Sequence, residues 1–166
     1  MDALRTTTAI AAMALATVQI GVARVNAQDA KTNMWTCWDV TSSEDPVGDR
    51  PDHKLAYNWD ICRIDSGPLA GGLATGEMSW EHDGVKSKEF TLRLIVRKPG
   101  ATALLEGKSG AMTPVITDGK VTGMTGEGRY DYVMATGSWA SLTGKSETWT
   151  FKSIGPKDFT VEGKVE

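Results

Sequence analysis

The sequence predicts an all-β fold, an antiparallel eight-stranded barrel, with a two-sheet β-sandwich as the alternative. Large apolar residues occupy every second position from Phe90 to Val96, which is the period of a strand with one buried face. Glycines interrupt the β-prone residues 123–151 at short intervals, as they do in strongly coiled strands. No long helical period follows the N-terminal segment. Because closing a sheet removes its exposed edges, we prefer the barrel.

Residues 1–27 are typical of a signal peptide. Arg5 supplies a positive charge, and residues 9–22 form an Ala-rich apolar run that is too short to span a bilayer. An amphipathic first helix is the alternative, but small residues surround the whole run rather than one face. Residues 25–27 fit the small-x-small rule, so we expect cleavage after Ala27. The protein is then exported, periplasmic or secreted, with one domain over residues 28–166.

The charge of the chain excludes some classes of partner. The net charge is −3, and no stripe of Lys and Arg occurs. We therefore expect neither nucleic-acid binding nor, once the signal peptide is removed, insertion into a membrane.

The two cysteines, Cys37 and Cys62, are expected to form a disulfide in an exported chain. Such a bond closes a loop of about 25 residues and contributes on the order of 3 kcal/mol. The two histidines, His53 and His82, have no ligand spacing relative to the cysteines. The sequence therefore predicts no metal site.

The disulfide assigns residues to the two faces of the first predicted strands, 34–40 and 55–64. Alternation places the bonded cysteines on one face, which also carries Trp35, Asp39, Asn58 and Asp60. The other face is more apolar, and we interpret it as the core; it carries Trp38, Val40, Tyr57, Trp59 and Ile61. Arg63 lies on this second face and must therefore sit at a barrel mouth or find a partner. Residues 41–54 contain Pro46, Gly48 and Pro51 and predict a long surface loop.

The middle of the chain continues as strands. In residues 72–81, one predicted face is formed by Ala74, Gly76, Met78 and Trp80. A turn at residues 83–84 leads into the strand that ends before Pro99. Residues 101–106 and 114–117 predict two weaker strands, which are separated by a loop that opens at Gly107.

The glycine-punctuated region predicts three further strands, 121–129, 138–143 and 147–153, with residues 130–136 as a connection. A last strand is expected at residues 158–165, where Phe159, Val161, Gly163 and Val165 are in phase. This gives eight or nine strands with short connections.

The segment Gly126-x-Gly128-x-Tyr130 is followed by Ala135-Thr136-Gly137 and then by a strand of Trp, Ser and Thr. This pattern resembles the C-terminal half of allene oxide cyclase-like barrels. These are calycin-type barrels, related in shape to dirigent proteins and lipocalins. The resemblance implies eight antiparallel strands around a largely apolar cavity, in a superfamily that cyclises, steers or binds hydrophobic small molecules. Such barrels often assemble through their outer faces, so a homo-oligomer is compatible with it. None of the cyclases' functional residues can be carried over to this chain.

A search for catalytic motifs finds no nucleophile elbow, phosphate-binding loop or zinc-protease motif. His82 falls in a predicted turn and His53 in a polar loop. Single carboxylates in or beside strands could become acid-base groups if they faced inward; these are Glu77, Glu81, Glu106 and Glu127. The catalytic residues are therefore unknown, and no cofactor is expected.

Six tryptophans occur in this short chain. They either fill the core or line a cavity for an apolar or aromatic small molecule, with a few polar groups fixing its orientation. The candidate ligand-binding residues are Trp38, Tyr57, Trp59, Arg63, Met78, Trp80, Arg129 and Tyr130. Three functions remain open: a small-molecule-binding barrel, a cyclase or isomerase acting on an apolar substrate, and a non-catalytic envelope interaction scaffold. An open cavity favours the first two, and a filled barrel favours the third.

Overall fold

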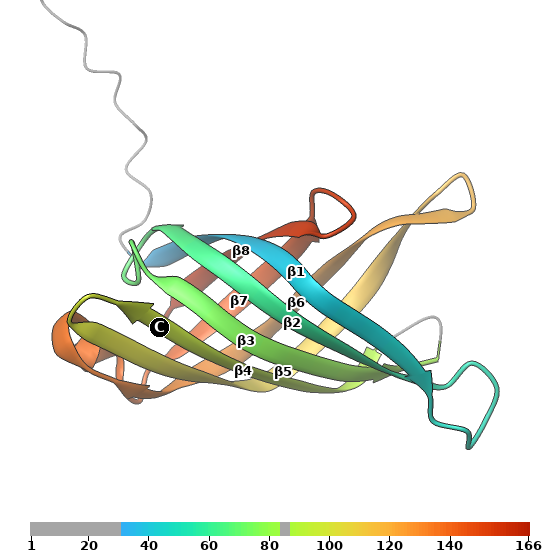
Figure 1. Ribbon diagram of the computed structural model, residues 1–166, viewed down its shortest axis with the longest axis horizontal. Helices are drawn as coiled ribbons and strands as arrows, with labels where there is room; N and C mark the ends of the chain where they lie inside the picture. The colour runs from blue at the N-terminus through green and yellow to red at the C-terminus, as the bar shows by residue number, and fades with distance from the viewer. Residues whose placement is uncertain (1–30, 84–86) are drawn as a thin grey trace, which may run out of the picture.

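The computed structural model describes residues 31–83 and 87–166, and these form a closed antiparallel barrel of eight strands (Figure 1). The strands follow one another around the barrel in chain order, and the last one pairs with the first. Their bounds are β1 Thr32–Pro46, β2 Lys54–Ser66, β3 Leu73–His82, β4 Ser87–Lys98, β5 Ala101–Thr117, β6 Lys120–Ala135, β7 Ser146–Ser153 and β8 Asp158–Val165. The predicted barrel is confirmed. The expected signal peptide lies outside the described residues.

Alternation identifies the inward face of several strands correctly. Leu92, Leu94 and Val96 of β4 are buried, as are Ala74 and Met78 of β3. The predicted bounds of the last strand coincide with those of β8. The predicted disulfide between Cys37 and Cys62 is present, and both residues belong to the buried core.

The interior face of β1 and β2 was predicted wrongly. Cys37, Cys62 and Trp35 are buried, whereas Trp38 and Trp59 are 38% and 48% exposed. The disulfide face therefore points into the barrel, and the more apolar face points outward. An eight-stranded barrel has little room inside. Its core already holds three tryptophans from β1, β7 and the segment after β6, so the remaining large rings of β1 and β2 lie outside.

Two predicted loops are parts of strands. β1 and β2 extend through most of residues 41–54, leaving residues 47–53 as the connection. β5 runs without a break through Gly107 and Gly110. A Cβ at Gly107 would lie 2.9 Å from Leu92 Cβ, and one at Gly110 would lie 2.5 Å from the Phe90 ring. These glycines make room for large side chains of β4 rather than opening a loop.

The region after Arg129 also differs from the prediction. Residues 130–135 continue β6, with Tyr130 and Tyr132 buried on its inner face. Residues 137–142, predicted within a strand, form the 3-10 helix η1 (Gly137–Leu142). Gly137 has a φ of +60°, a conformation that ends the extended strand and that side chains other than glycine rarely adopt.

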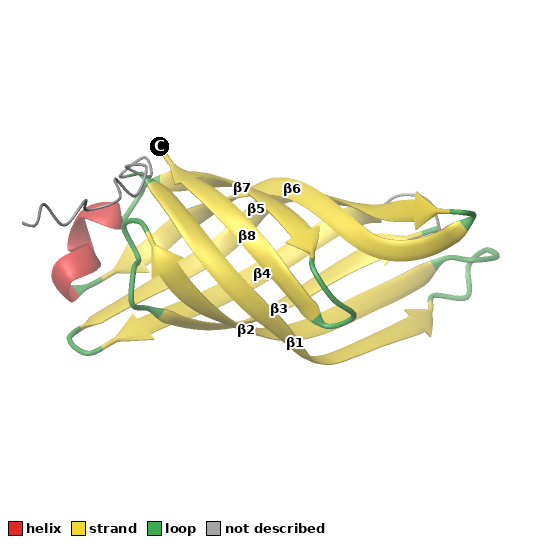
Figure 2. Cartoon of the chain, turned by 90° about the horizontal axis from the view of Figure 1, so that it is seen from above, coloured by secondary structure: helices red, strands yellow, loops and turns green. Residues whose placement is uncertain are grey.

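The helix η1 lies at one end of the barrel, as Figure 2 shows. Its Trp139 and Leu142 are buried, and a Cβ at Gly72, after β2, would lie 3.0 Å from the Trp139 ring. Leu69, from the connection between β2 and β3, is fully buried in the same core cluster. These side chains close this end of the barrel, which we call the closed end.

The other end has an uneven wall. β7 and β8 have 8 residues each, but their neighbours β6 and β1 have 16 and 15. β1 therefore pairs with β8 only as far as Trp38, and β6 pairs with β7 only from Thr125 onward. The hairpin of β5 and β6 extends beyond the barrel at this end (Figure 1). We call this the open end.

Candidate functional site

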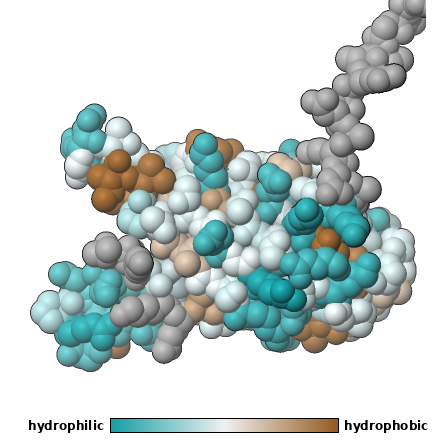
Figure 3. All heavy atoms as spheres, turned by 180° about the vertical axis from the view of Figure 1, so that it is seen from behind, coloured by the Kyte–Doolittle hydropathy of each residue, from teal (hydrophilic) through white to brown (hydrophobic). Residues whose placement is uncertain are grey.

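A cavity of about 540 Å³ lies at the open end, which is within the usual range for small-molecule sites. It is bounded by the protruding parts of β1 and of the β5–β6 hairpin, by β2 and β3, and by the connection between β7 and β8. In Figure 3 the apolar tip of the β5–β6 hairpin stands apart from a hydrophilic region at the same end. Exposed residues of this tip include Val115, Ile116 and Val121.

The cavity wall has a large apolar part and a smaller polar part. Phe151 and Phe159 pack together with ring centroids 4.8 Å apart, and Trp80 packs against the core. The apolar lining includes Ala56, Met78, Trp80, Met112, Met124, Phe151 and Phe159. The polar lining includes both acidic and basic side chains: Asp39, Ser42, Glu44, Asn58, His82, Ser153, Lys157 and Asp158. Such a wall suits a small molecule with an apolar body and a few polar atoms.

Two aspartates face each other at the inner part of the β1–β2 wall. Asp39 of β1 pairs in register with Asp60 of β2, next to the disulfide pair of Cys37 and Cys62. Asp60 is only 4% exposed. Burial, and then the charge of Asp39, raise the pKa of Asp60 to about 7. This carboxyl can therefore gain or lose a proton near neutral pH.

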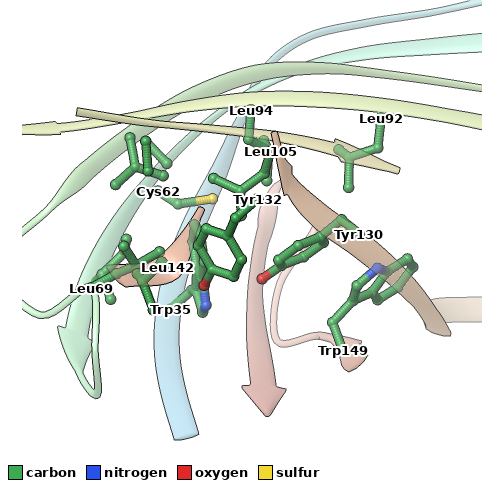
Figure 4. Close-up of a cluster of buried hydrophobic side chains, with 14 of the residues drawn as sticks. Trp35, Cys62, Leu69, Leu92, Leu94, Leu105, Tyr130, Tyr132, Leu142 and Trp149 are labelled. Atoms are coloured by element: carbon green, nitrogen blue, oxygen red, sulfur yellow. The ribbon is translucent and has the colours of Figure 1, made fainter. Parts of the chain in front are cut away.

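A second buried carboxylate, Glu147 of β7, lies nearer the closed end and is fully buried. The hydroxyls of Tyr130 and Tyr132 donate hydrogen bonds to its two oxygens, and Asn33 Nδ2 donates another at 2.8 Å. Asn33 Oδ1 in turn accepts a hydrogen bond from the Leu69 backbone N–H at 2.8 Å. We call these four side chains the Glu147 network. Figure 4 shows both tyrosines inside the apolar cluster, with Trp149 and Leu142 nearby.

Burial raises the pKa of Glu147, while the hydrogen bonds from both tyrosines and Asn33 act in the opposite direction. Burial and the neighbouring Glu147 also raise the pKa of Tyr130 and of Tyr132, so both hydroxyls keep their protons. A Cβ at Gly163 of β8 would overlap the Glu147 carboxyl. Only glycine leaves room for this carboxyl beside β8.

The Glu147 network is separated from the cavity. None of its four side chains lines the cavity, and the disulfide, Trp35 and Trp149 occupy the next inward positions toward the open end. Its hydrogen bonds join β1, β6, β7 and the segment after β2. We therefore assign it a structural role in holding the closed end together.

A third ionisable group, His53, lies near the rim of the open end and is only 6% exposed. Its Nδ1 contacts an Asp49 carboxylate oxygen, and its Nε2 lies 2.9 Å from Glu81 Oε2 of β3. These contacts, Asp49 first, raise the pKa of His53. The histidine ties the connection between β1 and β2 to β3.

The structure separates the sequence-predicted ligand residues into three groups. Met78 and Trp80 line the cavity. Tyr130 belongs to the Glu147 network. The other five do not line the cavity; these are Trp38, Tyr57, Trp59, Arg63 and Arg129. Arg63 Nε lies 2.6 Å from Asp65 and Arg129 Nη1 lies 3.1 Å from Glu166, so both arginines form ion pairs on the surface.

Sequence reasoning missed Asp39 and Asp60 as candidate site residues and Glu147 as a buried structural carboxylate. Glu147 is in phase with Trp149 and Phe151, so the alternation already placed a carboxylate on an apolar face. Asp39 and Asp60 were assigned correctly to the disulfide face, but that face was taken to point outward. The error in choosing the interior face therefore hid the two aspartates.

Comparison of the chain with protein-family models, with curated proteins and with solved structures found no match. The resemblance to allene oxide cyclase-like barrels thus stays a prediction. Among residues 31–83 and 87–166, no group of three or more Cys, His, Asp and Glu side chains is placed to hold a metal ion. No helix within the same ranges is long and apolar enough to cross a membrane.

Proposed function

We propose that the protein binds an apolar or aromatic small molecule in the cavity at the open end. The observation that carries this proposal is the asymmetry of the barrel interior. Packed side chains fill the closed end, whereas the open end contains a cavity of about 540 Å³ with an aromatic and methionine-rich wall. Methionine side chains adapt their shape, and aromatic rings offer flat contact area, so this wall suits such a ligand.

We further propose that the protein acts outside the cytoplasm, in a periplasm or in the medium, after cleavage of a signal peptide at Ala27. The disulfide between Cys37 and Cys62 supports an oxidising compartment. The pattern of residues 1–27 supports the cleavage.

A cyclase or isomerase activity in the same cavity is the second candidate function. It is favoured by Asp60, which faces the cavity-lining Asp39, because a carboxyl with a pKa of about 7 is suited to accept and return a proton at neutral pH. An apolar cavity can also accelerate a cyclisation by holding a substrate in a folded shape. The envelope scaffold has less support, since the barrel interior is not filled at the open end.

Native mass spectrometry of the protein purified from its own host tests the binding function. We expect a co-purifying small molecule whose removal changes tryptophan emission, because Trp80 lines the cavity. A Trp80→Phe variant should show a smaller emission change on removal of the same molecule. The proposal is wrong if the chain carries no small molecule and no apolar or aromatic compound in a broad panel alters its emission.

The same experiment separates binding from catalysis. A bound molecule that is recovered unchanged after incubation supports a binding protein. A molecule that is recovered as an isomer of the one added supports the enzyme.

A further inference from the structure

Two opposed aspartates lie at the inner end of the cavity, Asp39 in its lining and Asp60 directly beyond it. Asp39 of β1 lines the cavity and pairs in register with Asp60 of β2. Asn58, the next inward residue of β2 toward the open end, also lines the cavity. The register of β1 shifts immediately after Asp39, and such bulges re-aim side chains beside binding sites. The aspartate pair therefore lies where the cavity meets the packed core.

One oxygen of each aspartate lacks a hydrogen-bond partner among the described residues. Among the residues that the structure describes, no group donates a hydrogen bond to Asp39 Oδ1 or Asp60 Oδ1, and both atoms are inaccessible to solvent. Asp60 as a whole is 4% exposed. The Glu147 carboxylate, by contrast, is equally deep but receives three hydrogen bonds. Burying a carboxyl oxygen without a donor is unfavourable, so this wall favours a ligand that supplies donors.

The neighbouring arginine does not neutralise this wall. Arg63 comes shortly after Asp60 in β2, but its side chain is 61% exposed and pairs with Asp65. The facing inward position of β3 is Gly76, which carries no side chain. A ligand therefore meets negative charge at Asp39, which is backed by Asp60. It meets apolar contact at Met78, Trp80, Phe151 and Phe159. The rings can also lie against a cation.

We propose that the cavity is selective for organic ammonium compounds, with the protonated amine against Asp39, which faces Asp60, and the apolar or aromatic body against the rings. This inference rests on the proposed function, since it names the chemical class of the ligand in the same cavity. A neutral ligand of the same shape brings no positive charge to the two carboxyl groups. Burial raises the pKa of Asp60, and a bound ammonium group would lower it again.

Calorimetric titration of the full chain with three indoles of similar size tests the inference. Tryptamine carries an ammonium group, tryptophol carries a hydroxyl in its place, and indole-3-propionate carries a carboxylate. We expect tryptamine to bind roughly tenfold or more tightly than tryptophol, a difference of about 1.4 kcal/mol, and indole-3-propionate to bind most weakly.

Two variants assign the preference to the aspartate pair. Asp60→Asn keeps the shape of the side chain, and it should lower tryptamine affinity roughly tenfold while changing tryptophol affinity little. Asp39→Asn should act in the same direction. Asp45→Asn alters an exposed carboxylate of β1 and should leave both affinities unchanged. Circular dichroism before each titration establishes that the variant is folded.

The outcomes separate this inference from the proposed function. Equal or tighter binding of tryptophol, unaffected by Asp60→Asn, overturns the ammonium preference but leaves the apolar cavity as a binding site. Stoichiometric binding of Ca²⁺ that Asp60→Asn abolishes, without a preference for tryptamine, overturns it in favour of a metal-ion site. Failure of all three indoles and of the panel of neutral compounds to bind refutes both proposals.

Discussion

At the scale of single residues, the two buried carboxyl groups of this barrel, Glu147 and Asp60, differ in their hydrogen-bond partners. Glu147 is surrounded by donors from Tyr130, Tyr132 and Asn33. Asp60 faces Asp39 and has an oxygen without a donor. Because a buried polar group is stabilising only when its partners are present, we assign Glu147 to structure and Asp60 to ligand binding.

The Glu147 network predicts the effect of removing one hydroxyl. Tyr132→Phe removes a donor from the buried Glu147 carboxylate and should lower the free energy of unfolding by about 2 kcal/mol. Tyr57→Phe removes a hydroxyl on the outer surface, and it should change the free energy of unfolding by less than about 0.5 kcal/mol. Urea denaturation of both variants measures the difference. Equal effects of the two substitutions would show that the network is not stabilising.

Asp60 predicts a pH dependence of stability. Its pKa is about 7 in the folded state and 3.8 for an ordinary aspartate, so the folded protein binds an extra proton between these two pH values. The wild-type protein should therefore lose stability as the pH rises toward 7, by up to roughly 4 kcal/mol. Asp60→Asn should abolish this loss. The variant should therefore be more stable than the wild-type protein at about pH 8, and its advantage in free energy of unfolding should be smallest at about pH 4. Urea denaturation across this range measures it. A constant difference between the two proteins at all pH values would contradict the assignment.

At the scale of the elements, glycines in β6 decide how closely side chains approach the strand. A Cβ at Gly128 would overlap both the Trp149 ring and the Ser109 carbonyl oxygen. These glycines were recognised in the sequence as sites of close approach or coiling. The side chain that occupies the space, Trp149 of β7, could not be identified without the barrel register.

Gly128→Ala should destabilise the protein by about 1–3 kcal/mol, because the added methyl group must displace a buried ring and backbone. Gly123→Ala in the same strand is the matched control, since its Cβ would meet only Ser153 Cβ at 3.3 Å. Thermal unfolding of both variants provides the comparison. If Gly123→Ala destabilises the protein as much as Gly128→Ala, then β6 requires glycine for its backbone conformation and not for the space beside it.

The connection between β1 and β2 depends on His53. Its raised pKa means that the contribution of protonated His53 to stability is complete below the ordinary histidine pKa of 6.5. That contribution is lost as the pH rises through the folded-state pKa. A proton NMR titration of the His53 ring should therefore have its midpoint above 6.5, and Asp49→Asn should lower this midpoint. A midpoint at or below 6.5 in the wild-type protein would contradict the contacts with Asp49 and Glu81.

The sequence predicted the elements unevenly for physical reasons. Strict alternation located β4, and the phase of Phe159, Val161 and Val165 located β8. Alternation defines two faces of a strand but does not say which one is inside, and the interior face of β1 and β2 was chosen wrongly for this reason. The helix η1 was missed because Trp139 and Leu142 are spaced for one helical turn within a segment too short to show a period.

At the scale of the whole molecule, the barrel combines a closed end and an open end. The closed end is fixed by η1, Leu69 and the Glu147 network. The short strands β7 and β8 lower the wall at the open end, where the cavity lies. The sequence predicted the barrel but left open whether its interior is filled or holds a cavity, because this depends on strand lengths and register. Only Met78 and Trp80 among the predicted ligand residues line it.

The central claim is that a small molecule occupies the cavity at the open end. The most direct measurement is a carbon–proton NMR spectrum of the protein with labelled methionine methyl groups, recorded during titration with tryptamine and with tryptophol. Met78, Met112 and Met124 line the cavity, whereas Met134 is 43% exposed on β6 and does not. We predict that the methyl signals of the three lining methionines shift together and saturate, while that of Met134 stays in place. Signals of the lining methionines that do not move with either compound, or that move no more than that of Met134, would contradict a ligand site in this cavity.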